Sequence, residues 1–563
     1  MSIRSKIIAI IAKAVPKGTE IDVRPAEEHQ GVHYATTIAF ALAKVGKNNP
    51  REVAAHIAEA IAKKAPKGFF ETVEVAGSGF INLTLSKKTI RKEFAAMISS
   101  NGRWQRPEDG KKRTIVIDYS HPNIAKPMSI AHIRSTIIGQ ALYNIFTFAG
   151  WKAIGDNHLG DWGKQFGILI AAFKMSGLKN ESALSIDELM ELYVDYTAKM
   201  KEDPALEERA REEVKRLQDG NEENMRIWKV FYKVSLDEFE KIYKILGVTF
   251  DYYLGESFYN NELPGVVRNA LREGVAKKSD GAIVIFTHED KTPFIIQKSD
   301  GSYLYATTDL AAIGYRVKKF KADLAMYVVD NGQSFYFEQL FKAAEMLKLA
   351  PKTDLVHVKF GLFLAEDMKK FSTRAGRHVS LEKLIEEAIV RARKIVEEKN
   401  PELNENEKER IARTVGVGAL KYNDLSQNRL SNIAFNWDKM LNFEGNSAPY
   451  LQYTYTRLMS ILKKAEAGKF DPAFLTEPIE EKLIVNLFEF PETIEEITHS
   501  YYPNHLTDYL YALAKDANYF YQTLPVLKAD EKVRNARLAL LGVVADTLKN
   551  GLELLGIEVA ERM

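Results

Sequence analysis

The stretch SHPNIAKPMSIAHIRSTIIG at residues 120–139 directly follows the apolar, β-branched run TIVIDY at 114–119. A strand that ends in a proline-containing loop, followed by apolar residues at helical spacing, predicts a strand–loop–helix unit. Such a unit directs backbone N–H groups towards an anion, as many mononucleotide sites require. We therefore expect the chemistry to start here, among polar residues that a purely structural turn does not need: Asn123, Lys126, Ser129, His132 and Arg134.

The composition predicts a multidomain cytoplasmic enzyme. At 563 residues the chain exceeds a single core, so roughly three or four domains are expected. Hydrophobic residues make up 46% and charged residues 27%, and no apolar run approaches the ~20 residues that cross a bilayer. The absence of cysteine excludes disulfides and thiolate metal sites.

Charge alone does not indicate a nucleic-acid binder. The 78 basic and 76 acidic residues give a net charge of +2, so RNA binding would have to depend on local patches. The segment PALEERAREEVKRL at 204–217 mixes both signs at helical spacing. That pattern is more typical of a solvated helix face than of a binding site.

The order of predicted elements indicates an α/β multidomain chain. Residues 1–105 alternate helical periods with short strands and predict a small N-terminal α/β domain. Residues 106–380 alternate β-branched runs with helices, the pattern of a Rossmann-type parallel sheet, with a helical insertion at about 183–248. A helical connection at 381–445 and an all-α domain at 446–563 follow. The β-branched runs are TIVIDY (114–119), GAIVIFT (281–287), LAMYVVD (324–330) and LVHVKFGLF (355–363).

Several motifs occur in an order that is hard to reach by chance. They are SIAH (129–132), NHLGDWGKQFG (157–167), KSDGSYLYATTDLAA (298–312), KKFSTRAG (369–376), GVGALKYNDL (416–425), FEGNSAPYLQYTYTR (443–457) and LKNGLELLGIEVAERM (548–563). In this order they resemble the arginyl-tRNA synthetases of class I, with SIAH as the HIGH-type motif and KKFSTRAG as the KMSKS-type loop. The resemblance spans nearly the whole chain.

This resemblance implies that the chain activates L-arginine with ATP and passes the arginyl group to the terminal ribose of tRNA(Arg), releasing AMP and pyrophosphate. Attack of a carboxylate on the α-phosphorus depends on positioning and on cations that stabilise developing charge. The catalytic residues implied by the resemblance are His132, Lys126, Lys370 and Ser129. The implied ATP contacts are His132, Ser129, Gly361, Leu362, Lys370, Ser372 and Arg374.

Recognition of arginine needs carboxylates that meet a planar fork of donors in a desolvated pocket. The positions that match the family's arginine contacts are Asp118, Asn123, Tyr305, Asp309 and Gln333. Asp309 could also be a surface acid and Tyr305 a core residue, but both lie inside the larger block YATTD at 305–309. For His158 and Trp162, simple packing near a glycine-rich turn is an equally serious interpretation.

The tRNA contacts implied by the resemblance lie at both ends of the chain. GSGFIN at 77–82 resembles the element that touches the D-loop, which implicates Phe80 and Asn82. Tyr521 and the terminal Met563 lie where the family contacts the anticodon region. A hydrophobic strand end is an equally good interpretation of Phe80, and aromatic residues on helices are more often core.

The sequence departs from the family pattern at several positions. Ser129 replaces the first histidine of the HIGH-type motif, and Ala131 its glycine. A hydroxyl can donate a hydrogen bond but cannot carry a cationic imidazole. His121 stands where a small residue is common, and Thr373 replaces the second lysine of the KMSKS-type loop. Lys126 resembles the cation that compensates for that missing lysine.

The resemblance further implies that activation requires bound tRNA and that no editing domain exists. We expect Mg²⁺ to accompany ATP, no structural metal, no membrane partner and a monomer. Two alternatives stay open. A paralogue that binds tRNA without aminoacylating it is favoured by Ser129 and disfavoured by the complete arginine pocket. A nucleotidyltransferase of the same fold would need neither terminal domain.

Overall fold

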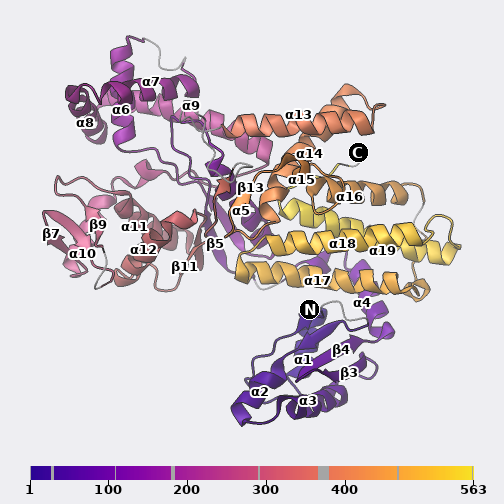
Figure 1. Cartoon of the computed structure of the whole chain (residues 1–563). Helices are drawn as coiled ribbons and strands as arrows, with labels where there is room; N and C mark the ends of the chain where they lie inside the picture. The colour runs from indigo at the N-terminus through magenta and orange to yellow at the C-terminus, as the bar shows by residue number, and fades with distance from the viewer. Residues whose placement is uncertain are drawn as a thin grey trace.

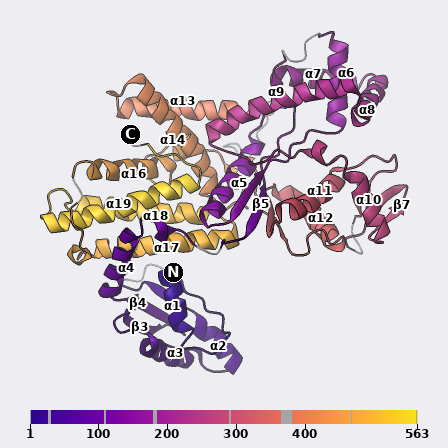
Figure 2. The same cartoon turned by 180° about the vertical axis from the view of Figure 1, so that it is seen from behind.

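The computed structural model describes residues 2–26, 31–107, 110–178, 184–288, 292–364, 380–465, 468–560 and 562–563. The N-terminal domain lies below helix α17 (Pro478–Ser500) in both views (Figures 1 and 2). A central α/β body carries a separate helical lobe on one side and a bundle of long helices on the other. No helix in these described ranges is long and apolar enough to cross a membrane.

The N-terminal domain is built on an antiparallel sheet in the order β1-β2-β4-β3. Alternation in FINLTL buries Ile81, Leu83 and Leu85 and turns Phe80 and Asn82 to the other face. The elements are α1 (Ile3–Ile11), β1 (Arg24–Pro25), β2 (Tyr34–Thr36), α2 (Ile38–Gly46), α3 (Pro50–Lys64), β3 (Phe70–Ala76), β4 (Phe80–Leu85) and α4 (Lys87–Ser99).

The central sheet is parallel, with the order β11-β10-β5-β6. Its strands are β5 (Thr114–Asp118), β6 (Lys152–Asp156), β10 (Leu324–Tyr327) and β11 (Asp354–His357). The chain runs from β5 through helix α5 (Ala131–Phe148) to β6, and later returns to β10 on the other side of β5. Ligands of open α/β sheets bind at such a reversal of strand order, beyond the carboxyl ends of the strands.

The predicted strand at 281–287 does not join this sheet. It forms β8 (Ala282–Ile285), between β7 (Ala276–Ser279) and β9 (Phe294–Gln297), in a separate antiparallel sheet. Asp280 and Gly281 both have positive φ, at 49° and 83°, in the two-residue turn before β8. An Asp-Gly turn of this kind joins antiparallel neighbours, whereas a parallel pair needs a long crossover.

The charged insertion is helical, as the sequence predicts. It contains α7 (Ile186–Lys199), α8 (Pro204–Gln218) and α9 (Glu222–Leu246), which pack with α6 (Lys164–Ser176) into the lobe seen in Figure 1. Side chains of Ser185, Asp203 and Asn221 cap the three helices. The remaining helices of the central body are α10 (Leu263–Arg272), α11 (Tyr305–Tyr315) and α12 (Ser334–Met346).

The rest of the chain is almost wholly helical. It comprises α13 (Leu381–Lys399), α14 (Glu405–Leu425), α15 (Trp437–Met440), α16 (Ala448–Leu462), α17, α18 (Asn504–Thr523) and α19 (Glu531–Leu554), with a short parallel pair of β12 (Phe363–Leu364) and β13 (Ile433–Ala434). Gly551 lets α19 approach α18, because a Cβ there would lie 2.5 Å from Leu510. The α/β multidomain class with a helical C-terminal domain is confirmed, while the boundaries at 105, 380 and 445 stay predictions.

A buried arginine ties the central domain to the helices that follow it. Arg134 on α5 donates from Nε to Asp424 on α14 at 3.0 Å, and both side chains are almost fully buried. Its Nη1 donates to the carbonyls of Gly361 at 2.6 Å and Ser431 at 2.9 Å. A planar guanidinium can satisfy several acceptors at once, so α5 is held in register with α14 and with the strand end at Gly361.

The N-terminal domain docks on α17 through a buried carboxyl group. Glu492 is 4% exposed, and its Oε1 accepts the backbone N–H of Arg4 at 3.0 Å. Burial raises the pKa of Glu492 to about 8. The protonated form is therefore favoured in the folded chain at neutral pH.

We predict a pH-dependent gain in stability for Glu492→Gln. Because the folded pKa is raised, the contribution of Glu492 is fully present at low pH and is lost as pH rises from the ordinary glutamate value towards about 8. The neutral amide does not titrate, so the variant should unfold at a higher temperature than the parent near pH 9, roughly one unit above that value, and at about the same temperature near pH 5. Differential scanning calorimetry measures both. The same difference in unfolding temperature between variant and parent at both pH values would contradict a protonated Glu492. The exposed Glu402→Gln variant is the control.

Candidate active site

Three side chains form a row at the carboxyl ends of neighbouring strands. Tyr327 on β10 is in register with Asp118 on β5, which is in register with Asp156 on β6. All three are buried. Because the strands are parallel, residues in register point to the same side, so the two carboxyl groups and the tyrosine ring face a common space.

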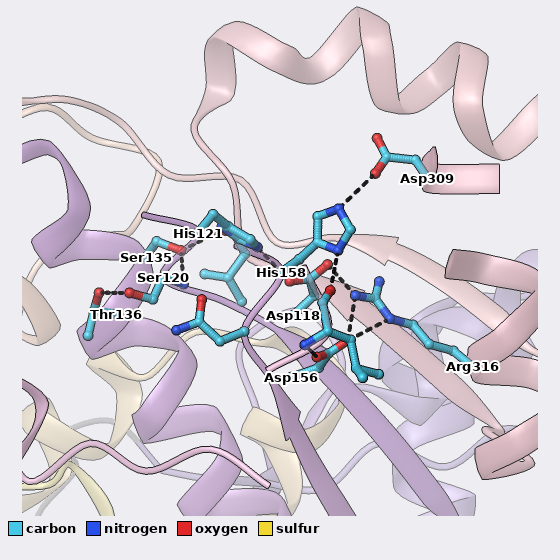
Figure 3. A network of polar contacts seen from close by, with 12 residues as sticks. Asp118, Ser120, His121, Ser135, Thr136, Asp156, His158, Asp309 and Arg316 are labelled. Atoms are coloured by element: carbon cyan, nitrogen blue, oxygen red, sulfur yellow. Dashed lines mark hydrogen bonds and ion pairs between the residues drawn. The ribbon is translucent and has the colours of Figure 1, made fainter. Parts of the chain in front are cut away.

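Arg316, just after α11, joins this row (Figure 3). Its Nη2 donates to Asp118 Oδ2 at 2.7 Å and to Asp156 Oδ2 at 2.8 Å, and its guanidinium lies 5.2 Å from the centre of the Tyr327 ring. Burial raises the pKa of Asp118, but Arg316 and His121 outweigh burial and hold it well below its usual range. The pKa of Asp156 stays raised, because burial exceeds the effect of Arg316.

Asp309 on α11 faces this row, with His158 and Tyr336 in contact with it, and these residues form a second acidic layer. His158 donates from Nδ1 to the carbonyl of Leu254 at 2.8 Å, and its Nε2 lies 3.9 Å from Asp309 Oδ1. The hydroxyl of Tyr336 donates to Asp309. Burial lowers the pKa of His158, but Asp118 and Asp309 outweigh it and the net pKa is raised. Burial raises the pKa of Asp309.

The site holds more acid than base. Asp118, Asp156 and Asp309 surround Arg316 and His158, and burial raises the pKa of nearby Glu256 to about 7. For Asp156, Asp309 and Glu256, the raised pKa values mean that removing water from the carboxyl group costs more than the nearby cations return. A further cation in this space would therefore be strongly favoured, whereas an anion would be repelled.

The remaining sequence-predicted arginine contacts lie around this space. Tyr305 begins α11, one turn before Asp309, is 60% exposed, and its ring centre lies 5.0 Å from that of Tyr336. Asn123 lies against Gly160, where a Cβ would come within 2.2 Å of Asn123 Oδ1. Gln333 is exposed beyond the end of β10 and donates to Asp330 at 3.3 Å. Asn123 and Gln333 therefore follow the carboxyl ends of β5 and β10, and the contacts of all three residues with arginine stay predictions.

The HIGH-type motif forms the start of α5. The Ser129 backbone N–H donates to His132 Nδ1 at 3.0 Å, and Ser129 Oγ lies 3.1 Å from the same atom. The Ser129 carbonyl lies 3.2 Å from the same nitrogen, so a neutral ring can hydrogen-bond to Ser129 in either tautomer. Ser129 thus takes a structural part that the sequence did not suggest: it positions the His132 ring in the first turn of the helix.

Lys126 lies in the loop between β5 and α5 and touches the helical insertion. Its ammonium lies 4.6 Å from the centre of the Tyr193 ring on α7, and burial lowers its pKa. The same loop is fixed by Ser235 on α9, whose Oγ accepts the Ala125 N–H at 2.8 Å, and by Gln165 on α6, which donates to the Ile124 carbonyl. The lobe therefore shapes the loop that carries Lys126.

The backbone at Gly361 and Leu362 is already engaged within the chain. The Gly361 N–H donates to the Arg429 carbonyl at 2.9 Å, and its own carbonyl accepts from Arg134. The Leu362 N–H donates to Asn432 Oδ1 at 2.8 Å, and its carbonyl accepts from Ile433 at 2.9 Å. Leu362 is 38% exposed, so its side chain is more accessible to a ligand than the engaged backbone groups of Gly361 and Leu362. Lys370, Ser372 and Arg374 lie outside the described residues.

The predicted tRNA contacts are at the surface. Phe80 is 43% exposed at the start of β4, beside half-buried Asn82. Tyr521 on α18 is 41% exposed, and the guanidinium of Arg457 lies 5.3 Å from its ring centre. Met563 lines a cavity of about 570 Å³ together with Lys399, Phe443, Tyr453, Arg457, Asn518 and Gln522. Aromatic, amide and cationic groups in one cavity suit an unstacked base.

Family models match nearly the whole chain. The class I (R) tRNA synthetase catalytic domain matches residues 93–437, the DALR anticodon-binding domain 451–563, and the arginyl-tRNA synthetase N-terminal domain 1–85. The chain belongs to the class I arginyl-tRNA synthetase family. Its catalytic-domain match alone covers more than half of the chain.

Individual members of the arginyl-tRNA synthetase family align over the full length. The arginine–tRNA ligase of Hahella chejuensis is 41% identical over 99% of this chain and 98% of its own, and that of Laribacter hongkongensis is 40% identical with the same coverage. The crystal structure of the Plasmodium falciparum arginyl-tRNA synthetase superposes with a TM-score of 0.84 at 28% identity, covering 100% of this chain and 98% of that one. The Thermus thermophilus enzyme has the same score at 25% identity, with both chains fully covered.

Sequence reasoning missed part of this synthetase site. Asp156, Tyr336 and Arg316 had no predicted role, and His158 was left between packing and function. Asp156 ends β6 as Asp118 ends β5, but the β6 sequence KAIGD holds a single β-branched residue, so it gave no comparable strand signal. No local pattern marks Arg316, since only the sheet brings Asp118 and Asp156 within its reach.

We predict that Arg316→Gln lowers the free energy of unfolding by about 3–5 kcal/mol, because two buried carboxyl groups lose their shared cation. Arg316→Lys should lower the free energy of unfolding less, because lysine keeps the positive charge but lacks the planar set of guanidinium donors. Urea unfolding followed by circular dichroism measures both changes. The matched control is the exposed Arg272→Gln on α10. An Arg316→Gln variant as stable as this control would contradict the proposed importance of the ion pairs.

Proposed function

We propose that the chain carries out the arginine–tRNA ligase reaction of its family with the acidic space between β5, β6 and α11 as its arginine pocket. The observation that supports this assignment most directly is the excess of buried carboxyl groups around Arg316 and His158. A guanidinium brings a permanent charge and a planar set of donors to such a pocket. A neutral or acidic side chain would leave the carboxyl groups unpaired.

In this proposal Asp118 and Asp309 accept hydrogen bonds from the substrate guanidinium. Tyr305 covers the mouth of the pocket, where its exposed ring lies beside Tyr336. Asn123 and Gln333, at the carboxyl edge of the sheet, contact the α-amino and carboxylate end of arginine. This orientation directs the substrate carboxylate towards the start of α5, where the phosphates of ATP bind.

Adenylate formation joins the arginine carboxylate to the α-phosphorus of ATP and releases pyrophosphate. The proposed role of His132 is to donate from Nε2 to the phosphate, while Ser129 holds the ring in place through contacts with Nδ1. Lys126, Lys370, Ser372 and Arg374 stabilise the negative charge that develops on the phosphates. Mg²⁺ arrives as part of the MgATP substrate.

Adenine recognition follows from the same geometry. Because the backbone groups of Gly361 and Leu362 are engaged, we propose that the base packs on the exposed Leu362 side chain. A carbonyl oxygen has two lone pairs, so the carbonyls of both residues can still accept one more hydrogen bond each. Arg134 holds the Gly361 carbonyl in place from the opposite side.

The proposal assigns tRNA contacts to both ends of the chain. Phe80 stacks with a base of the D-loop and Asn82 contacts it from the same face of β4. Tyr521 and the cavity at Met563 receive nucleotides of the anticodon loop. We further propose a monomeric cytoplasmic enzyme that activates arginine only when tRNA(Arg) is bound. No observation favours the non-catalytic paralogue, because Ser129 supports His132 instead of disabling the motif.

Arginine-dependent ATP–pyrophosphate exchange, with and without tRNA(Arg), tests the function. Exchange only in the presence of tRNA is the expected result. Exchange without tRNA would contradict the proposed coupling. The absence of exchange in both conditions, with intact tRNA binding, would support the non-catalytic paralogue.

In the same assay we predict that Asp309→Asn lowers kcat/KM for arginine by about 100-fold or more, because the amide loses charge and turns an acceptor into a donor. The KM for ATP should not change. Exposed Asp280→Asn, in the turn before β8, provides a matched control. Wild-type kinetics for Asp309→Asn would remove this residue from the pocket.

A second kinetic prediction concerns the helical lobe. Tyr193→Leu should slow arginine activation about 3- to 10-fold, because the Lys126 ammonium loses the ring that orients it. Tyr193→Phe retains the ring and should keep most of the rate. Single-turnover adenylate formation with tRNA bound measures the effect, with the exposed neighbour Val194→Ala as control. Equal rates for the leucine and phenylalanine variants would exclude a cation–π contribution.

A further inference from the structure

Both oxygens of Asp118 are already engaged inside the chain. Oδ2 accepts from Arg316 at 2.7 Å, and Oδ1 accepts from His121 Nε2 at 2.7 Å. Asp118 itself is buried, so the substrate reaches its carboxylate only by sharing or replacing one of these partners. The two partners differ sharply in their freedom to move.

Arg316 cannot be the partner that leaves. Its side chain is 1% exposed and also pairs with Asp156. The His121 side chain is 24% exposed and makes its bond to Asp118 from the loop side (Figure 3). Removing Arg316 would uncover two buried carboxyl groups, whereas His121 can turn towards water and be hydrated there.

The loop is built to direct His121 at Asp118. Ser120 and His121 both have positive φ, at 81° and 54°, which non-glycine residues adopt rarely. The Ser120 N–H donates to Ser135 Oγ at 2.9 Å, and its Oγ bonds with Tyr243 at 2.8 Å and accepts from Thr136 at 2.9 Å. Such unfavourable backbone conformations persist where the surroundings fix them, and they cluster at functional sites.

The chemistry of the contact makes it exchangeable. The carboxylate is ionised and can only accept, so His121 Nε2 carries the proton and donates one bond. A substrate guanidinium offers a parallel pair of charged donors to the same carboxylate. The histidine therefore satisfies Oδ1 while the pocket is empty, when a buried acceptor without a donor would be costly, and is the weaker partner once arginine is present.

We infer that His121 is a substrate-exchangeable partner of Asp118, which holds Oδ1 in the empty pocket, yields it to the arginine guanidinium, and thereby sets the affinity for arginine. The inference rests on the proposed role of Asp118 in binding arginine. It predicts that the histidine weakens arginine binding by competition and has no part in binding ATP.

The test is equilibrium dialysis of labelled L-arginine against the full-length protein and its variants. His121→Gly and His121→Ala both remove the imidazole, and glycine also suits the positive φ at this position. We expect the Kd for arginine to fall about 3- to 10-fold in both, the size of one lost competing hydrogen bond. The Kd for ATP should be unchanged. Exposed His56→Ala on α3 is the matched control.

Unchanged or weaker arginine binding by both His121 variants, with wild-type unfolding transitions, would overturn the inference. A stable glycine variant decides the question if the alanine variant does not fold. Asp118→Asn separates this outcome from failure of the proposed function. If Asp118→Asn binds arginine as tightly as the parent, the proposed pocket itself is wrong. If Asp118→Asn binds weakly while the His121 variants show no gain, only the exchange by His121 is wrong.

Discussion

The ion pairs of Arg316 are the constraint on which the rest of the site depends. One guanidinium joins Asp118 and Asp156 on neighbouring strands and fixes the end of α11 against the sheet. Because α11 carries Tyr305 and Asp309, this anchor determines where the second acidic layer lies. It also leaves the pocket short of positive charge, since one buried arginine and one histidine face several carboxyl groups. In the proposed arginine pocket, the resident Arg316 therefore leaves carboxyl groups that favour a second guanidinium.

A second buried arginine connects the active site to the helical half of the chain. Arg134 lies two residues after His132 and contacts Asp424, Gly361 and Ser431 at once. Arg134 therefore ties the start of α5 to the proposed adenine contact and to α14. The helical lobe acts on the same region from the other side, because α6, α7 and α9 each contact the loop that carries Lys126. These contacts connect both the helical lobe and α14 to the start of α5, where we propose that the phosphates of ATP bind.

Much of this architecture was predictable because its signals are local. Apolar periodicity gave the parallel strands and the long helices, and the ordered motifs gave the family. Two kinds of feature were predicted wrongly or not at all. The run at 281–287 has the composition of a parallel strand, and only the Asp280–Gly281 turn marks it as part of a hairpin. The contact between Ser129 and His132 was not predicted, because it depends on how the chain folds at the start of α5.

The sequence by itself determined the family, the order of domains and the residue types available for chemistry, because these follow from motifs and short-range periodicity. Only the tertiary structure decided which charges meet. Asp118, Asp156 and Arg316 are separated by up to 198 positions along the chain and touch because parallel strands place equivalent ends in register. The folded chain also places His121, three residues from Asp118, in a hydrogen bond with this carboxylate, which the family resemblance had assigned to arginine. Long-range electrostatics of this kind depends on distance and burial, and neither quantity is encoded in residue spacing.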